Sequence, residues 1–137
     1  MDTTLRVTAD LQDIVRITDF VTETALVLGG DLDAVGEIIV ALHEALSNTI
    51  IHGYHRQPGI IEVEVKRQGD DLAVYLRDEA PLFDPRIVPT PDISLPLDQR
   101  AYGGMGVHMM RNFTDELHYQ VTDSNQNELI LVKKAAF

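Results

Sequence analysis

The sequence contains no cysteine, which excludes disulfide bonds and thiolate metal sites. Basic residues are also scarce: 11 Lys and Arg stand against 22 Asp and Glu, so the formal net charge is −11. A field of this sign repels phosphate backbones and anionic lipid surfaces, so we expect no direct binding to nucleic acid or to membranes. A basic protein partner, or a cation that screens a bound anion, is compatible with the charge.

Long hydrophobic runs and targeting segments are missing as well. No apolar run approaches the roughly 20 residues that a membrane-spanning helix needs. The N-terminus has no basic region followed by an apolar one, as a secretory signal would have. We therefore expect a soluble, cytoplasmic protein. The 137 residues are enough for one hydrophobic core but few for two, which predicts one domain over residues 1–137.

Several catalytic motifs are absent or broken. The P-loop pattern G-x-x-x-x-G-K-[ST] does not occur. The zinc motif H-E-x-x-H begins at His43, but position 47 is serine, and Ser47 has no Ser-His-Asp partners at a known spacing. The dinucleotide pattern G-x-G-x-x-G begins with Gly104 and Gly106 but has Met109 at its third glycine. The sequence therefore supports none of these four kinds of site.

Hydrophobic periodicity predicts the regular elements. Helical spacing covers residues 11–28, which "GG" ends, and residues 35–50, in a helix that Asp31 or Asp33 caps and Gly53 ends. A short helix follows the glycines near residue 104. Alternating residues predict five strands, at 5–10, 60–67, 72–78, 115–121 and 128–135.

The order of these elements predicts the fold class. Strands joined by short turns pair as hairpins, and the order β-α-α-β-β-loop-α-β-β predicts a two-layer α/β sandwich. Its sheet is mixed but mostly antiparallel, with the helices on one face. Residues 79–102 contain five of the six prolines and show no period, which indicates a functional loop or lid.

Three polar residues recur every fourth position at the end of the second helix: Glu44, Asn48 and His52. Positions four apart drift by only about 40° around a helix, so these side chains form one column. Leu42 and Leu46 lie near the opposite side and would face the sheet. The polar column would then face solvent or a cleft.

A carboxylate and an amide on adjacent turns suit phosphoryl chemistry. A carboxylate can take a proton from an attacking hydroxyl. A carboxamide oxygen is a hard ligand for Mg²⁺, which bridges nucleotide phosphates and spreads their charge. One turn separates Glu44 from Asn48 by roughly 6 Å, which is the right scale for a γ-phosphate between them.

Three segments, in order, resemble the sequence boxes of the GHKL (Bergerat-fold) ATPases, the group of gyrase, bacterial histidine kinases and mismatch-repair ATPases. "EALSNTIIHGY" (44–54) resembles the N-box, in the form most like the anti-sigma-factor serine/threonine kinases. "RDEAPLFDP" (77–85) is similar to the Asp-x-Gly box, and "GGMGVHMMRNFTDELHY" (103–119) to the Gly-x-Gly box. The resemblance covers nearly the whole chain and implies one histidine-kinase-like ATPase domain with the Bergerat fold.

The resemblance implies a role for each matched residue. Glu44 would be the general base, Asn48 would hold Mg²⁺, and Asp78 would accept a hydrogen bond from the adenine amino group of ATP. Other residues would line the nucleotide site or meet the phosphates with their backbone: Ala80, Gly104, Met105, Gly106 and Val107. Arg100 would be a phosphate contact or a solvated loop residue. His52 would pack or hydrogen-bond at the helix end, and His43 and His108 would be structural.

One box departs from the family pattern. The family reads Asp-x-Gly-x-Gly, whereas this chain has Asp78-Glu79-Ala80-Pro81-Leu82. Glycine allows close backbone approach and positive φ, which Ala80 and Leu82 resist. The adenine pocket is expected to be narrower, or its loop stiffer.

Three functions follow from these observations. The first is a protein-serine/threonine kinase that sequesters a sigma factor and phosphorylates a STAS-type anti-sigma antagonist. The second is a protein-binding module of the same fold in which nucleotide binding is weakened or lost. The third is a histidine kinase catalytic domain that acts in trans. The resemblance also implies a homodimer, because family members often dimerise.

Overall fold

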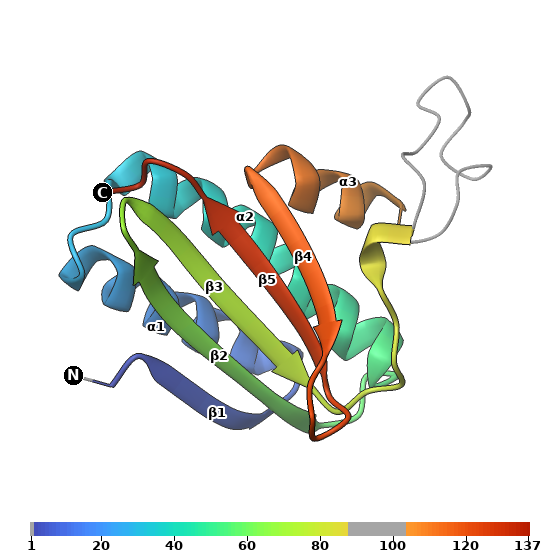
Figure 1. Cartoon of the computed structure of the whole chain (residues 1–137). Coiled ribbons are helices and arrows are strands. Elements are labelled where there is room, and N and C mark those ends of the chain that lie inside the picture. The colour runs from blue at the N-terminus through green and yellow to red at the C-terminus, as the bar shows by residue number, and fades with distance from the viewer. Residues whose placement is uncertain (1, 88–103) are drawn as a thin grey trace.

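The computed structural model describes residues 2–87 and 104–137, in which a five-stranded sheet is covered on one face by helices (Figure 1). Every pairing in this sheet is antiparallel, and the strand order is β1-β2-β3-β5-β4. The predicted two-layer α/β sandwich is confirmed, with a sheet more regular than the mixed one expected. The elements are β1 (Thr4–Ala9), α1 (Ile14–Val27), α2 (Leu32–Asn48), β2 (Gly59–Gln68), β3 (Asp71–Asp78), α3 (Gly104–Asn112), β4 (Glu116–Val121) and β5 (Asn127–Lys133).

Aspartates start both long helices. Asp10 and Asp13 form a capping box, in which each side chain accepts a hydrogen bond from the backbone of the other end of a 3-10 turn (Leu11–Asp13). The first helix was predicted to begin at Leu11, but α-helical bonding begins after this turn, at Ile14. Asp31, not Asp33, caps α2, because its Oδ2 accepts from the Ala34 N–H at 3.0 Å.

Helix α2 provides the largest share of the helical side of the core. Its Ile38, Leu42 and Leu46 are fully buried, as the helical period predicted. They pack in one cluster with inward-facing strand residues such as Val74 and Leu131. Helix α1 lies beside α2 on the same face, and α3 packs against the other side of α2 near β4 (Figure 1).

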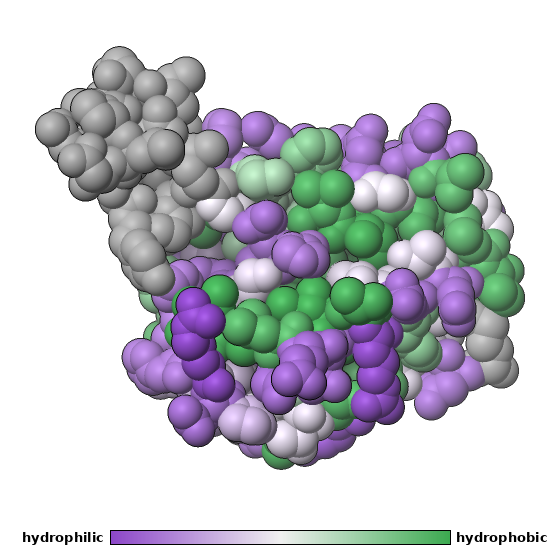
Figure 2. Space-filling model, turned by 180° about the vertical axis from the view of Figure 1, so that it is seen from behind, coloured by the Kyte–Doolittle hydropathy of each residue, from purple (hydrophilic) through white to green (hydrophobic). Residues whose placement is uncertain are grey.

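The helix from Leu32 to Gly53 is long and apolar enough, by length and composition, to cross a membrane. The expectation that no segment would meet this criterion was therefore wrong. The apolar residues have a use within the fold, because those on one side of α2 are covered by the sheet. Figure 2 views the helical side, where apolar side chains gather in bands between polar ones, and exposed examples on α1 and α2 are Val15, Val27 and Leu32.

The opposite face of the sheet carries an ion-pair network centred on Arg77. Its guanidinium donates to Glu62 at 2.7 Å and Glu64 at 2.8 Å on β2, and to Glu128 at 2.5 Å on β5. Burial alone would raise the pKa of Glu128, but hydrogen bonds from Arg77 and Gln120 outweigh it and leave the pKa below its usual range. The network therefore ties the three central strands together across their outer face.

We expect Leu42→Ala to lower the free energy of unfolding by about 2–5 kcal/mol, because it leaves a cavity between α2 and the sheet. Leu32→Ala on the same helix is the matched control, since Leu32 is 71% exposed and its loss should cost less than about 0.5 kcal/mol. Urea denaturation measures both. Equal losses would show that the helix does not pack as described.

We expect Arg77→Met to lower the free energy of unfolding at pH 7 by about 1–3 kcal/mol, because three carboxylates lose their shared partner. The depressed pKa of Glu128 means that its stabilising contribution is present above the unfolded pKa and is lost as the pH falls through the folded pKa. In the variant, protonation instead relieves repulsion between the carboxylates.

The difference between wild type and Arg77→Met should therefore shrink from pH 7 to about pH 4 in denaturant titrations. Arg6→Met is the control, because Arg6 meets Glu62 only at 3.7 Å from a largely exposed position, and its loss should cost less than about 0.5 kcal/mol. A pH-independent loss in Arg77→Met would contradict the network.

Candidate functional site

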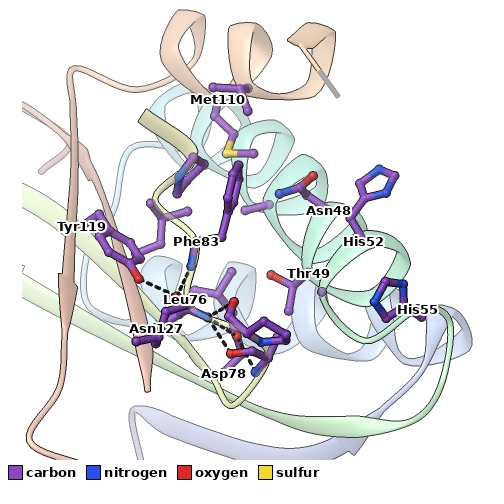
Figure 3. A pocket seen from close by; sticks show the side chains of 18 residues that line it. Asn48, Thr49, His52, His55, Leu76, Asp78, Phe83, Met110, Tyr119 and Asn127 are labelled. Carbon is purple, nitrogen blue, oxygen red and sulfur yellow. Dashed lines mark hydrogen bonds between the residues drawn. The ribbon is translucent and has the colours of Figure 1, made fainter. Parts of the chain in front are cut away.

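A cavity of about 450 Å³ lies between the C-terminal end of α2, the ends of β3 and β5, and α3 (Figure 3). Its wall is largely apolar, with a few polar groups that point inward, which is the usual composition of a small-molecule site. The polar residues on its wall are Asn48, Thr49, His52, His55, Asp78, Tyr119 and Asn127. Leu76, Ala80, Val107 and Met110 are among the apolar ones.

The structure brings the predicted polar column to this cavity. Asn48 and Asp78, which lie 30 positions apart in the sequence, both line the larger cavity. A smaller cavity of about 170 Å³ adjoins it, and Asn48 and His52 line both. Glu44 and Gly106 line only the smaller one. The column from Glu44 to His52 therefore runs along both cavities.

Glu44 lies directly against the backbone of the glycine box. A Cβ added to Gly106 would be 3.3 Å from Glu44 Oε2, tighter than an ordinary contact. Gly106 therefore gives the Glu44 carboxylate room beside the first turn of α3. Of the other residues of this box, Gly104 begins α3 and Met105 follows within it, while Val107 is buried and lines the larger cavity.

The end of α2 widens into a π-helical turn, Thr49–Gly53. The Tyr54 N–H donates to the Thr49 carbonyl at 2.9 Å, which is a bond across five residues. Such turns are frequent at functional sites. Here the turn carries Thr49 and His52, and both line the larger cavity. Hydrophobic periodicity cannot distinguish this turn from regular α-helix, so it was not predicted.

Asp78 is a buried carboxylate at the end of β3, with 6% of its surface exposed. Its Oδ1 accepts from the Ala80 N–H at 3.0 Å and from Asn127 Nδ2 at 2.9 Å. Burial raises the pKa of Asp78, and the hydrogen bonds from Asn127, the Ala80 backbone and Thr49 oppose this rise. The carboxylate is therefore held by donors on three sides while it lines an apolar cavity.

Asn127 is a polar residue of the cavity wall that the sequence did not single out. It faces Asp78 across the last rung of the β3–β5 ladder, and its side chain connects Asp78 with the segment that follows β3. A signal was present, because Asn127 precedes Leu129 and Leu131 at the spacing of two that marks the inward face of a strand. A polar residue on that face, at the strand end, is an exception that needs a partner.

Gly53 and Ala80 touch where the family pattern is broken. A Cβ on residue 53 would lie 2.9 Å from the Cβ of Ala80. Gly53 does end the helix, as predicted, but its φ is not positive, and the left-handed residues that turn the chain are His55 and Arg56. The reason for glycine at position 53 is therefore space for the Ala80 methyl.

Tyr54 connects the same region to the sheet. Its hydroxyl donates to the Ile60 carbonyl at 2.6 Å and accepts from the Glu79 N–H at 2.7 Å. The ring also lies over Gly59, where an added Cβ would be 2.5 Å from three ring atoms. The end of α2, the start of β2 and the end of β3 are thus held together beside the cavity.

The remaining predicted residues are placed as follows. His43 is exposed on α2, and the His108 ring contacts Asn112 Nδ2 at 3.1 Å, one turn along α3. Arg100 lies outside the described residues. Within residues 2–87 and 104–137, no group of three or more His, Cys, Asp or Glu residues is arranged to hold a metal ion. A cation at Asn48 would therefore need oxygen ligands from a bound molecule.

Comparison with known proteins gives consistent results. The sequence matches the family described as histidine kinase-like ATPase domain over residues 7–133. An anti-sigma F factor of Clostridium novyi (strain NT) is 31% identical over 106 residues, which are 75% of this chain and 73% of that protein. The serine/threonine-protein kinase BtrW of Bordetella bronchiseptica is 29% identical over 94 residues, 68% of this chain and 66% of that protein.

A crystal structure of the RsbU and RsbW domains of a Mycobacterium tuberculosis protein has a similar fold. The TM-score is 0.62 at 17% sequence identity, and the match covers 96% of this chain. This chain spans only 32% of that one. At this identity the likeness concerns the fold alone.

We expect Gly53→Ala to lower the free energy of unfolding by about 1–3 kcal/mol, because the new methyl overpacks against Ala80. The double variant Gly53→Ala/Ala80→Gly should recover most of this loss, since one methyl replaces the other. Gly36→Ala is the control: no atom lies within 4 Å of its added Cβ, so it should be neutral or slightly stabilising. Urea denaturation of wild type, Gly53→Ala, Ala80→Gly, the double variant and Gly36→Ala tests this, and strictly additive losses would show that the two positions are not in contact.

Proposed function

Because the chain belongs to the family of histidine kinase-like ATPase domains, we propose that it is an ATP-binding anti-sigma regulatory factor with serine/threonine kinase activity. It phosphorylates a STAS-type anti-sigma antagonist and sequesters a sigma factor in the cytoplasm. The observation that carries this proposal is the placement of Asn48 and Asp78 in one cavity, with Glu44 one helical turn away in the adjoining cavity. The names of the relatives, an anti-sigma F factor and a serine/threonine-protein kinase, favour the same activity.

The larger cavity suits a purine nucleotide. Its apolar wall can cover a purine ring, and the buried Asp78 carboxylate offers an acceptor to an exocyclic amino group. Asn48 lies where the two cavities meet and would hold Mg²⁺ together with phosphate oxygens of the nucleotide. Gly104 and Gly106 would let backbone amides at the start of α3 approach the phosphates.

Glu44 is the residue for proton transfer. ATP supplies the phosphoryl group when bound, and the attacking group would be a serine or threonine hydroxyl of the antagonist. The Glu44 carboxylate would accept the hydroxyl proton as the oxygen attacks. Its place beside Gly106, one turn from Asn48, keeps it next to the part of the site proposed for the phosphates.

A second candidate is a protein-binding module of the same fold with little or no nucleotide affinity. The observation in its favour is the loss of both glycines of the Asp-x-Gly-x-Gly pattern at Ala80 and Leu82. Ala80, Leu82 and Phe83 all line the larger cavity, so their side chains take up space there. Calorimetry that shows no ATP affinity at millimolar nucleotide, with and without Mg²⁺, would favour this module over the kinase.

We expect Glu44→Gln to lower phosphate transfer from Mg-ATP to a STAS-type antagonist by about 10²- to 10⁴-fold, because it removes the proton acceptor. ATP affinity, measured by calorimetry on the same protein, should stay within about twofold, since the shape of the side chain is kept. The readout is radiolabelled phosphate on the antagonist.

Glu37→Gln is the matched control, because Glu37 lies two turns earlier on the same helix and pairs with Lys133 instead of lining either cavity. It should transfer phosphate at nearly the wild-type rate. Retained transfer in Glu44→Gln would show that another group acts as the base.

A further inference from the structure

Asn127 connects more partners than any other residue on the cavity wall whose hydrogen bonds are described. It is buried, with 7% of its surface exposed, and stands at the start of β5 with its side chain on the helical face. In Figure 3 its amide lies between Asp78 and Tyr119, at the floor of the cavity. Its position opposite Asp78 is set by the sheet register and therefore by the backbone, not by a mobile loop.

The hydrogen bonds of Asn127 determine the orientation of its amide. Nδ2 lies 2.9 Å from Asp78 Oδ1, 3.1 Å from the Ala80 carbonyl and 3.3 Å from the Pro81 carbonyl, all of them acceptors. Oδ1 accepts from the Phe83 N–H at 3.0 Å and from the Tyr119 hydroxyl. A flipped amide would place its oxygen against three acceptors, so only one orientation is compatible with these neighbours.

This orientation has two consequences for Asp78. First, an N–H group is always directed at Oδ1, and this donor favours the ionised carboxylate over the neutral acid. Second, Asn127 and the Ala80 N–H both reach Oδ1, and Thr49 donates a further hydrogen bond to the carboxylate. All three neighbours are donors, so the remaining lone pairs of the carboxylate can accept from an incoming amino group.

Asn127 also holds the segment that lacks the family's glycines. It binds the carbonyls of Ala80 and Pro81 and the N–H of Phe83, so it holds three of the four consecutive residues 80–83. Glycines would give this segment freedom to approach a ligand, whereas here a side chain from the neighbouring strand fixes its path. The same amide therefore sets both the acceptor and the adjacent wall.

We propose that Asn127 is a positioning residue of this site, which presents Asp78 as a fixed acceptor and so makes the cavity select purines with a 6-amino group over 6-oxo purines. The proposal rests on the proposed function, in which this cavity binds the purine of ATP. An amino group donates to the Asp78 carboxylate, whereas a carbonyl at the same position would set two acceptors against each other. A site built around a hydrogen bond rejects an analogue that cannot make it.

The test compares ATP with ITP, which has a carbonyl oxygen in place of the 6-amino group. Both nucleotides are titrated by calorimetry, with Mg²⁺, into wild type, Asn127→Asp and a control. Asn127→Asp keeps the side-chain shape, replaces the donor nitrogen with an oxygen and adds a carboxyl charge. Gln126→Glu is the control, because it makes the same chemical change at the neighbouring position, whose side chain does not line the cavity.

We expect wild type and Gln126→Glu to prefer ATP over ITP by at least about tenfold, and Asn127→Asp to prefer it by less than about threefold. A merely structural loss would weaken both nucleotides equally and leave the ratio unchanged. An unchanged ratio in Asn127→Asp would therefore overturn the role of Asn127 while leaving the proposed function intact. Wild type that binds neither nucleotide would overturn the proposed function itself, and this role with it.

Asn127→Ser covers the case in which Asn127→Asp does not fold, because it removes the amide without adding a charge. The hydroxyl is too short to reach Asp78 and the segment after β3 together, so the ATP preference should fall by about three- to tenfold. Thermal melting of each variant establishes that it is folded. A folded Asn127→Ser protein with the wild-type ratio would also overturn the proposal.

Discussion

Helix α2 has to satisfy two surfaces at once, and the rest of the site depends on how it does so. Its apolar side packs against the sheet through Ile38, Leu42 and Leu46. Because that packing fixes the rotation of the helix about its axis, it also determines the direction in which the side chains on the other side point. Glu44 and Asn48 therefore reach the two cavities as a consequence of core burial. A helix that rolled by one residue would expose leucine and bury the carboxylate.

The wall of the larger cavity is stabilised by contacts that replace the flexibility of glycine. The Ala80 methyl fits because residue 53 has no side chain. The Tyr54 hydroxyl joins the start of β2 to the end of β3, and the Asn127 amide joins β5 to the segment after β3. Each of these contacts restricts the conformational freedom of the wall before any ligand binds. Binding therefore carries a smaller entropy cost, because the wall is already ordered.

The two faces of the sheet handle charge in different ways. On the outer face, Arg77 is shared by three glutamates, and the charges are paired within the protein. On the inner face, Asp78 is surrounded by neutral donors, from Asn127, Thr49 and the backbone, instead of a cation. These donors oppose the rise in the pKa of Asp78 that burial causes, and its remaining lone pairs can accept from a ligand.

The sequence by itself determined the elements, the fold class and the polar column, because these depend on periods of 2 and 3.6 residues that local composition carries. It also indicated Asp78 and the glycine box through their resemblance to a family. The capping turn before α1, the π-helical turn and the roles of Asn127 and Gly53 came only from the tertiary structure. Asn127 acts through a partner 49 positions away, and Gly53 through the methyl of Ala80, 27 positions away. Contacts between such distant residues have no local signature, since they exist only once the sheet has fixed its register and α2 has packed against it.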